Sequence, residues 1–140
     1  FYIKNDRHVL LSDYAHHPNE IYHSARSIRQ LYQNRKITAI FQPHLYTRTR
    51  DFYKEFADAL SQLDEVILCD IYPAREEPIP GVTSKLIYDN LKEGVEKSLI
   101  SKDEVIGLVK ERDFDVLIVL GAGDLDNQVP QIANIIEAKQ

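Results

Sequence analysis

The chain has 140 residues, of which 44% are hydrophobic, and it carries a formal net charge of −5 at pH 7. This length and apolar share suit one globular domain and exclude a disordered chain. The acidic balance argues against nucleic-acid binding, which needs a basic face, and no apolar run approaches the roughly 18 residues of a membrane helix. We therefore expect neither nucleic acid nor a membrane among its partners. The single cysteine, Cys69, excludes an intrachain disulfide and fits a reducing, cytoplasmic setting.

Apolar strands and amphipathic helices alternate along the chain. Residues 1–4 and 7–11 are predicted to form a short strand pair with a turn at Asn5-Asp6. The other predicted strands are short apolar runs, at 37–41, 65–71, 98–100 and 114–120. The predicted helices have apolar residues at spacings of three and four or begin at a capping residue, and they span 19–33, 51–63, 83–91, 103–110 and 129–138.

This alternation predicts an α/β fold: a Rossmann-like, doubly wound, mostly parallel sheet with helices on both faces. The strands are too apolar for one face to be wet, so both faces need a helical cover. Right-handed crossovers place the carboxyl ends of parallel strands at one edge of the sheet. The corners after four strands, at residues 13–18, 42–50, 70–81 and 121–124, are thus predicted to form one shared rim. Ligands of open α/β sheets bind at such a rim.

The first corner, residues 13–18, carries an acid, a phenol and two imidazoles within five positions. An acid at the carboxyl end of a strand commonly binds a ribose hydroxyl, so Asp13 is a candidate nucleotide contact, the alternative being that it caps the next helix. Adjacent histidines usually point to different sides, which disfavours a metal site at His16 and His17. Positioning of a charged ligand, or plain hydrogen bonding within the loop, is the interpretation we prefer for them.

The second corner, residues 42–50, contains two arginines at a predicted helix start. A guanidinium fork suits a carboxylate or a phosphate. Arg48 is the functional candidate because His44 and Tyr46 share its corner, whereas Arg50 is interpreted as a solvated charge.

Two further corners are expected on the same edge. The proline-rich segment 72–81 is either a functional loop or a rigid connector. Gly121-Ala122-Gly123 does not match the GxGxxG pattern and no Walker lysine follows it, so close backbone packing is its simplest role.

Four blocks in this order resemble the C-terminal domain of the Mur ligases. They are Asp13-Tyr14-Ala15-His16-His17-Pro18-Asn19-Glu20-Ile21, Phe41-Gln42-Pro43-His44-Leu45-Tyr46-Thr47-Arg48-Thr49, residues 70–76 with 81–84, and residues 121–124. Nearly the whole chain is covered. The second block is similar to the alanine-adding members of the family in particular. A family member that recycles cell-wall tripeptide shares the first block but does not usually carry Phe-Gln-Pro-His.

The resemblance implies a three-domain cytoplasmic enzyme of peptidoglycan biosynthesis, with residues 1–140 as the third domain. The absence of methionine and the start at Phe1 agree with a piece of a longer protein. The UDP-binding N-terminal domain and the ATP-binding central domain would be its partners outside this chain. The implied enzyme is an ADP-forming acid–amino-acid ligase: ATP phosphorylates the lactyl carboxylate of UDP-N-acetylmuramate, and the amine of L-alanine attacks the acyl phosphate. ATP and Mg²⁺ would be held mainly by the central domain, so the isolated domain is expected to be inactive.

The same resemblance implies roles for individual residues. Asp13 and Tyr14 are expected to bind the nucleotide, and Tyr14, His16, His44 and Arg48 the substrates. His16, His44 and Arg48 are the candidate catalytic residues, and no metal ligand is expected in this domain. Leu45 stands where some relatives have arginine, so Arg48 either acts without that arginine or is helped by another domain. Two alternatives stay open: a related Mur ligase such as the tripeptide-recycling ligase, and a non-catalytic α/β ligand-binding domain.

Overall fold

A sheet with helices on both faces forms the centre of the computed structural model, which describes residues 3–4 and 7–139. Within these residues the sheet has six strands in the order β1-β2-β6-β3-β4-β5, and only β1 runs antiparallel to its neighbour. The strands are β1 (Ile3–Lys4), β2 (Val9–Asp13), β3 (Ile37–Phe41), β4 (Glu65–Leu68), β5 (Glu96–Leu99) and β6 (Val116–Leu120). The predicted fold class, α/β with a Rossmann-like and mostly parallel sheet, is confirmed.

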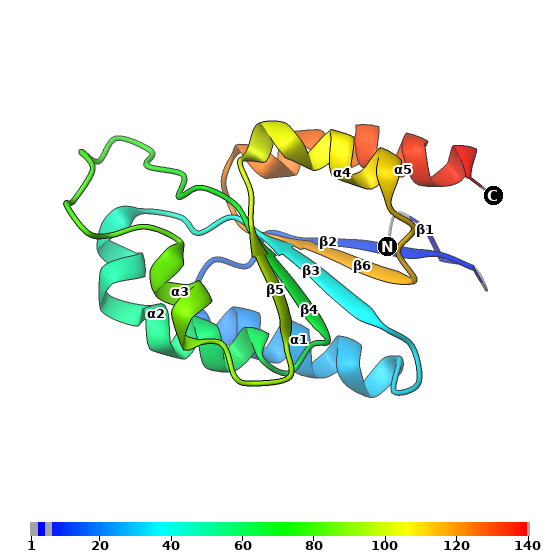
Figure 1. Cartoon of the computed structure of the whole chain (residues 1–140), viewed down its shortest axis with the longest axis horizontal. Coiled ribbons are helices and arrows are strands. Elements are labelled where there is room, and N and C mark those ends of the chain that lie inside the picture. The colour runs from blue at the N-terminus through cyan, green and yellow to red at the C-terminus, as the bar shows by residue number, and fades with distance from the viewer. Residues whose placement is uncertain (1–2, 5–6, 140) are drawn as a thin grey trace.

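The helices form two layers, one on each face of the sheet (Figure 1). One layer contains α1 (Pro18–Leu31), α2 (Tyr46–Leu60) and α3 (Lys85–Asn90), and the other contains α4 (Val105–Glu111) and α5 (Val129–Ala138). The 3₁₀ turns η1 (Lys102–Glu104) and η2 (Asp124–Gln128) lead into α4 and α5. In the part of the chain that the structure describes, no helix combines the length and apolar character needed to cross a membrane.

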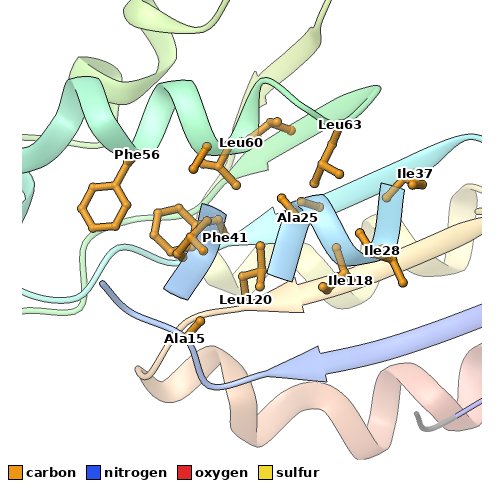
Figure 2. Close-up of a cluster of buried hydrophobic side chains, with 14 of the residues drawn as sticks. Ala15, Ala25, Ile28, Ile37, Phe41, Phe56, Leu60, Leu63, Ile118 and Leu120 are labelled. Carbon is orange, nitrogen blue, oxygen red and sulfur yellow. The ribbon is translucent and has the colours of Figure 1, made fainter. Parts of the chain in front are cut away.

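The central strands β3 and β6 are buried along their whole length and divide the core in two. Side chains alternate between the faces of a strand, so Phe41 and Leu120 pack toward α1–α3 while Ile40 and Leu117 pack toward α4 and α5. Figure 2 shows Phe41 facing Phe56 of α2. The centroids of the two rings are 5.4 Å apart. Because both faces of these strands are buried, their sequences are almost entirely apolar and do not alternate with polar residues.

Helix α2 begins five residues before its predicted start, so the predicted bounds of 51–63 are wrong. The carboxylate of Glu76, in the loop after β4, accepts hydrogen bonds from the backbone N–H groups of Tyr46 (2.6 Å) and Thr47 (3.1 Å). The helix therefore begins at a residue that is capped by a side chain from a distant loop, while the side chain of its own N-cap residue, Leu45, makes no capping hydrogen bond. The helix then kinks at Phe52 (φ −129°, ψ 15°), close to the start that the apolar spacing indicates.

Several other boundaries differ by a few residues. The strand predicted at 65–71 ends early, with β4, and the one predicted at 98–100 is β5. The first strand pair is confirmed, with Ile3 opposite Leu10, while the turn predicted at Asn5-Asp6 lies outside the described residues.

Helix α3 begins at Lys85, within the predicted 83–91, but its two candidate caps have different roles. The hydroxyl of Thr83 accepts a hydrogen bond from the backbone N–H of Lys85 at 3.2 Å. The hydroxyl of Ser84 instead donates to the carbonyl of Cys69. Ser84 is thus the N-cap residue by position, but its side chain ties α3 to the end of β4, and the hydroxyl that accepts the first helical N–H belongs to Thr83.

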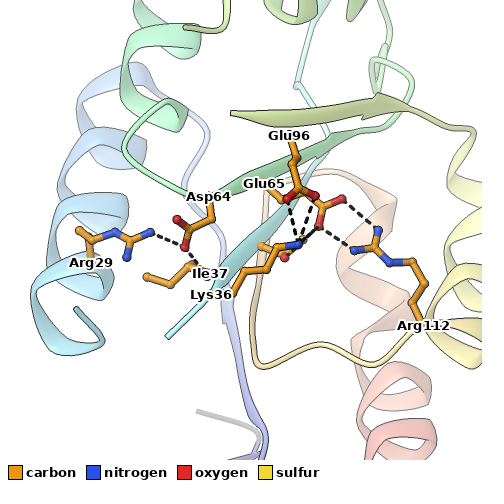
Figure 3. A network of polar contacts seen from close by, with 8 residues as sticks. Arg29, Lys36, Ile37, Asp64, Glu65, Glu96 and Arg112 are labelled. Carbon is orange, nitrogen blue, oxygen red and sulfur yellow. Dashed lines mark hydrogen bonds and ion pairs between the residues drawn. The ribbon is translucent and has the colours of Figure 1, made fainter. Parts of the chain in front are cut away.

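A network of ion pairs lies at the amino ends of the strands, opposite the predicted rim (Figure 3). Arg112 donates to both carboxylate oxygens of Glu65, at 2.7 and 3.0 Å, and Lys36 lies 3.6 Å from the same carboxylate. Arg29 pairs with Asp64 at 2.6 Å. Burial opposes ionisation of Glu65, but the hydrogen bonds and charge of Arg112, with the charge of Lys36, hold its pKa below the usual value. Ion pairs between Glu65, Arg112 and Lys36, and between Asp64 and Arg29, therefore stabilise this edge of the sheet.

Candidate functional site

The four predicted corners lie along one edge of the sheet. Asp13 stands in register with Leu120 of β6, which stands in register with Phe41 of β3, so the strands end level with one another. Backbone bonds join the corners directly: Gly121 N–H donates to the carbonyl of Asp13 (3.2 Å), and Gln42 N–H donates to the carbonyl of Leu120 (3.1 Å). The shared rim predicted from the crossovers is confirmed.

Asp13 ends β2 and ties the first corner to α1. Its Oδ1 accepts the backbone N–H of Ala15 at 3.0 Å, and its Oδ2 accepts the hydroxyl of Ser24, on α1. The N-cap of α1 is His17, so the alternative that Asp13 caps this helix is wrong. A carboxylate offers about four acceptor positions, so Asp13, which is partly exposed, retains capacity for a further donor such as a ribose hydroxyl.

The rings of the two adjacent histidines lie 5.7 Å apart, and each ring also has a second aromatic neighbour of its own. The ring of His16 lies 5.8 Å from that of His44, in the second corner, while the ring of His17 lies 6.4 Å from Phe52 of α2. Glu20 holds both backbones, accepting the N–H of His16 (3.2 Å) and His17 (3.0 Å). These backbone hydrogen bonds, led by that of His17, lower the pKa of Glu20. His16 thus joins the first corner to the second.

Two other observations concern what the first corner can bind. Tyr14 is 60% exposed, which leaves its ring free to stack on a ligand. Among the described residues no group of three His, Cys, Asp or Glu side chains could hold a metal ion.

In the second corner His44 and Arg48 form a pair. Arg48 Nη1 donates to His44 Nδ1 at 3.1 Å, and the imidazole stacks on Tyr72 with ring centroids 5.6 Å apart. Because a guanidinium has no acceptor, His44 must be unprotonated at Nδ1 and carries its hydrogen on Nε2. Burial, followed by the charges of Arg48 and His16, lowers the pKa of His44. The neutral form that this hydrogen bond requires is therefore the stable one.

Arg48 is half-buried, and no described carboxylate forms an ion pair with it. By contrast, Arg112 and Arg29 at the opposite edge are each paired with an acid. Arg50 is exposed and pairs with the neighbouring Asp51 at 2.9 Å, which agrees with its interpretation as surface charge. A partly desolvated guanidinium with spare donors is suited to an anionic ligand.

Gln42 is a rim residue that sequence reasoning did not single out. It directly follows β3 and is buried against the segment after β6, where its amide donates to Asp124 Oδ1 (2.9 Å) and accepts from Leu125 N–H (2.8 Å). A Cβ on Gly121 would lie 2.6 Å from the carbonyl oxygen of Gln42, and one on Gly123 would collide with the Gln42 side chain. The glycine turn thus serves close packing, as predicted. The sequence signal that could have identified Gln42 was an amide side chain directly after an apolar strand.

A pocket of about 660 Å³ opens beside the rim, at the carboxyl ends of β4 and β5. Its polar lining includes Asp70, Thr83, Ser101 and Glu104. Cys69 also lines it, but burial raises the pKa of this thiol to about 12, so it is not a nucleophile at neutral pH. Three of its lining residues belong to corners predicted from the sequence, Tyr46 to the second and Asp70 and Ile71 to the third.

The sheet with one reversed edge strand, and the acid, histidine and arginine corners on its rim, define an α/β domain with a polar rim at the carboxyl ends of its parallel strands. The chain belongs to the family described as the Mur ligase, glutamate ligase domain, whose model matches residues 2–123. It is similar to the UDP-N-acetylmuramate–L-alanine ligase of Phocaeicola vulgatus, with 66% identity over 139 residues, or 99% of this chain and 30% of that protein.

Solved structures share the fold. A UDP-N-acetylmuramate-alanine ligase from Thermotoga maritima superimposes with a TM-score of 0.75 at 26% identity, over 100% of this chain and 29% of that one. A single domain from Haemophilus ducreyi, assigned to a UDP-N-acetylmuramate:L-alanyl-γ-D-glutamyl-diaminopimelate ligase, has a TM-score of 0.65 at 19% identity and is covered over 93% of its length. The latter likeness concerns the fold alone. The chain spans about 30% of the length of the curated relatives that it matches.

Proposed function

We propose that this chain is the C-terminal domain of a cytoplasmic, ATP-dependent, ADP-forming ligase that joins L-alanine to UDP-N-acetylmuramate in peptidoglycan biosynthesis. The observation that carries the proposal is the 66% identity to a relative of that name across nearly the whole chain. The N-terminal UDP-binding and central ATP-binding domains would be supplied by the rest of the protein.

The second corner would receive the amino acid. Arg48 has donors to spare and no carboxylate partner among the described residues, so its guanidinium can take the carboxylate of alanine in a bidentate pair. His44 presents its Nε2–H, and the ring of His16 lies beside it. Together they would hold alanine with its amine directed at the activated carboxyl group, because placement of the two reactants supplies much of the rate of such a step.

The first corner would receive the nucleotide. Asp13 keeps acceptor positions for the ribose hydroxyls beyond its bonds to Ala15 and Ser24, and the exposed ring of Tyr14 stands next to it. These residues fit a nucleoside, and we propose that the exposed ring of Tyr14 also contacts the substrate. When bound, ATP with Mg²⁺ supplies the phosphoryl group that activates the lactyl carboxylate, and we propose that its phosphates and metal are held mainly by the central domain.

The test is a product assay on the full-length enzyme. With ATP, Mg²⁺ and UDP-N-acetylmuramate, we expect L-alanine to yield ADP, phosphate and UDP-N-acetylmuramoyl-L-alanine, while residues 1–140 alone yield none. Use of the cell-wall tripeptide in place of alanine would instead assign the chain to the recycling ligase. No ligation of either substrate, or a gene with no P-loop upstream of Phe1, would leave a non-catalytic domain.

A further inference from the structure

Glu76 lies in the loop after β4, where its backbone N–H donates to the carbonyl of Pro73, yet the described hydrogen bonds of its carboxylate all go to the second corner. One carboxylate oxygen accepts the backbone N–H groups of Tyr46 (2.6 Å) and Thr47 (3.1 Å), and the other accepts the hydroxyl of Thr47. These are the first two residues of α2. A negative charge at this position also complements the positive end of the helix dipole. In Figure 1 the loop after β4 reaches out beside the start of α2.

The residue that Glu76 flanks has an unusual backbone. Leu45, the N-cap of α2, has φ +75° and ψ 138°, a region that side-chain-bearing residues rarely occupy. Such conformations persist only where surrounding contacts hold them, and they gather at functional sites. Here Leu45 N–H donates to the carbonyl of Tyr72 (2.8 Å), and Tyr72 N–H donates to that of Pro43 (2.8 Å).

The strained residue separates the two partners of the rim pair. His44 immediately precedes Leu45 and lies before the helix, whereas Arg48 lies in its first turn. Their 3.1 Å hydrogen bond therefore depends on where α2 begins and on how the chain turns into it. If α2 began at residue 51, as its apolar spacing predicts, Arg48 would lie in an irregular loop. The start at Tyr46 is the position that Glu76 caps.

We propose that Glu76 is the positioning residue of the amino-acid site: by capping α2 from the neighbouring loop, it holds Leu45 in its strained turn and keeps His44 and Arg48 together at the rim. The proposal deepens the proposed function and rests on it for the identity of the ligand. Bonds from Thr47, its hydroxyl first, lower the pKa of Glu76, so the carboxylate is ionised at neutral pH. Glu76 itself need not touch substrate.

The first test reads the geometry without any substrate. In residues 1–140 labelled with ¹⁵N, the ring shifts of His44, assigned by their loss in His44→Gln, should show a protonated Nε2 and an unprotonated Nδ1. Glu76→Ala should convert this single tautomer to a mixture, and Glu76→Asp should do the same, since it keeps the charge but shortens the reach. Glu76→Gln retains an acceptor oxygen and should preserve it. Glu77→Ala, an equal loss of charge at the exposed next residue, is the matched control and should change nothing.

The second test uses the full-length enzyme. Glu76→Ala should raise the KM for L-alanine by about fivefold or more with little change in the KM for ATP, and Glu76→Gln should recover most of the loss. An unchanged His44 tautomer in Glu76→Ala and Glu76→Asp would overturn the proposal. So would a lost tautomer with unaltered alanine kinetics. Failure of the unsubstituted enzyme to ligate alanine would contradict the proposed function only, and the tautomer measurement would then decide the positioning role.

Discussion

Arg48 donates a hydrogen bond to Nδ1 of His44, four residues earlier, at 3.1 Å. The contact determines the protonation of the imidazole, because an arginine can only donate and His44 must then accept. The contact uses only Nη1 of Arg48, so the other N–H groups of the guanidinium can donate to a ligand. The pair thus combines a cation with a neutral N–H donor on one rim.

Acidification should break this pair. The pKa of His44 is lowered from its ordinary 6.5 by burial and by the charges of Arg48 and His16, so the folded state binds this proton less readily than the unfolded state. The stability that neutral His44 contributes is therefore present above pH 6.5 and decreases as the pH falls from 6.5 through the lowered pKa. We expect His44→Gln to make the unfolding free energy less pH-dependent between pH 7 and pH 5, measured by urea denaturation. An equal dependence in both proteins would contradict the neutral assignment.

Substitution of Asp13 should change the KM for ATP rather than the KM for L-alanine. Loss of a charged hydrogen bond to ribose, worth roughly 1.5–3 kcal/mol, predicts that Asp13→Ala raises the KM for ATP about tenfold or more in the full-length enzyme. Ser24→Ala is the control, because it removes one internal donor to the same carboxylate and leaves the carboxylate in place. It should lower stability by about 1 kcal/mol and leave the KM for ATP within about twofold. Equal KM effects in the two variants would make Asp13 a structural residue.

Alanine substitutions at two glycines, one in the glycine turn and one in α4, should change the stability in opposite directions. A Cβ on Gly123 would lie 2.7 Å from the Cβ of Tyr72 and closer still to Gln42, so Gly123→Ala should destabilise by about 1–3 kcal/mol. Gly107, within α4, has open space where a Cβ would lie. Gly107→Ala should therefore stabilise by roughly 0.5–1 kcal/mol. Urea denaturation of residues 1–140 measures both, and destabilisation by the two variants alike would refute the packing role.

The ion pairs at the amino ends of the strands should contribute to the stability of the domain and not to ligand binding. Arg112→Ala removes both hydrogen bonds to the buried Glu65 and should cost about 1.5–3 kcal/mol. Lys110→Ala, which removes an exposed charge in the last turn of α4, just before Arg112, should stay within about 0.5 kcal/mol of the parent. Because the pKa of Glu65 is lowered, this contribution is present above about pH 4.5 and is lost as the pH falls through the folded pKa. A difference between parent and Arg112→Ala that persists undiminished at pH 3 would disprove the assignment.

Most of the fold follows from local patterns in the chain. The apolar runs 37–41 and 129–138 predict β3 and α5 with the observed bounds, and parallel pairing then places the corners on one edge. The start of α2 could not be predicted in this way. Its cap is Glu76, some thirty residues later, and no local pattern reports a carboxylate that arrives from another loop.

The candidate site was likewise predictable from the sequence only in part. Asp13, His16, His44 and Arg48 carry recognisable chemistry and were identified from the sequence, and the structure brings His16, His44 and Arg48 together. Their roles in ligation stay predictions. Gln42 was not identified because its role, which is to hydrogen-bond the segment that follows the neighbouring strand β6, depends on strand order rather than on residue type.

Steady-state kinetics of Arg48→Ala in the full-length enzyme, with L-alanine and ATP varied in turn, tests the assignment of the rim to the amino acid. A bidentate guanidinium–carboxylate pair is worth roughly 1.5–3 kcal/mol, so kcat/KM for alanine should fall by about ten- to a hundredfold or more while the KM for ATP changes little. Arg48→Lys should recover only part of the loss, since an ammonium lacks the fork, and Arg50→Ala, an exposed arginine already paired with Asp51, should behave as the parent. Unaltered alanine kinetics in Arg48→Ala would mean that Arg48 is a surface charge and that the second corner is not part of the site.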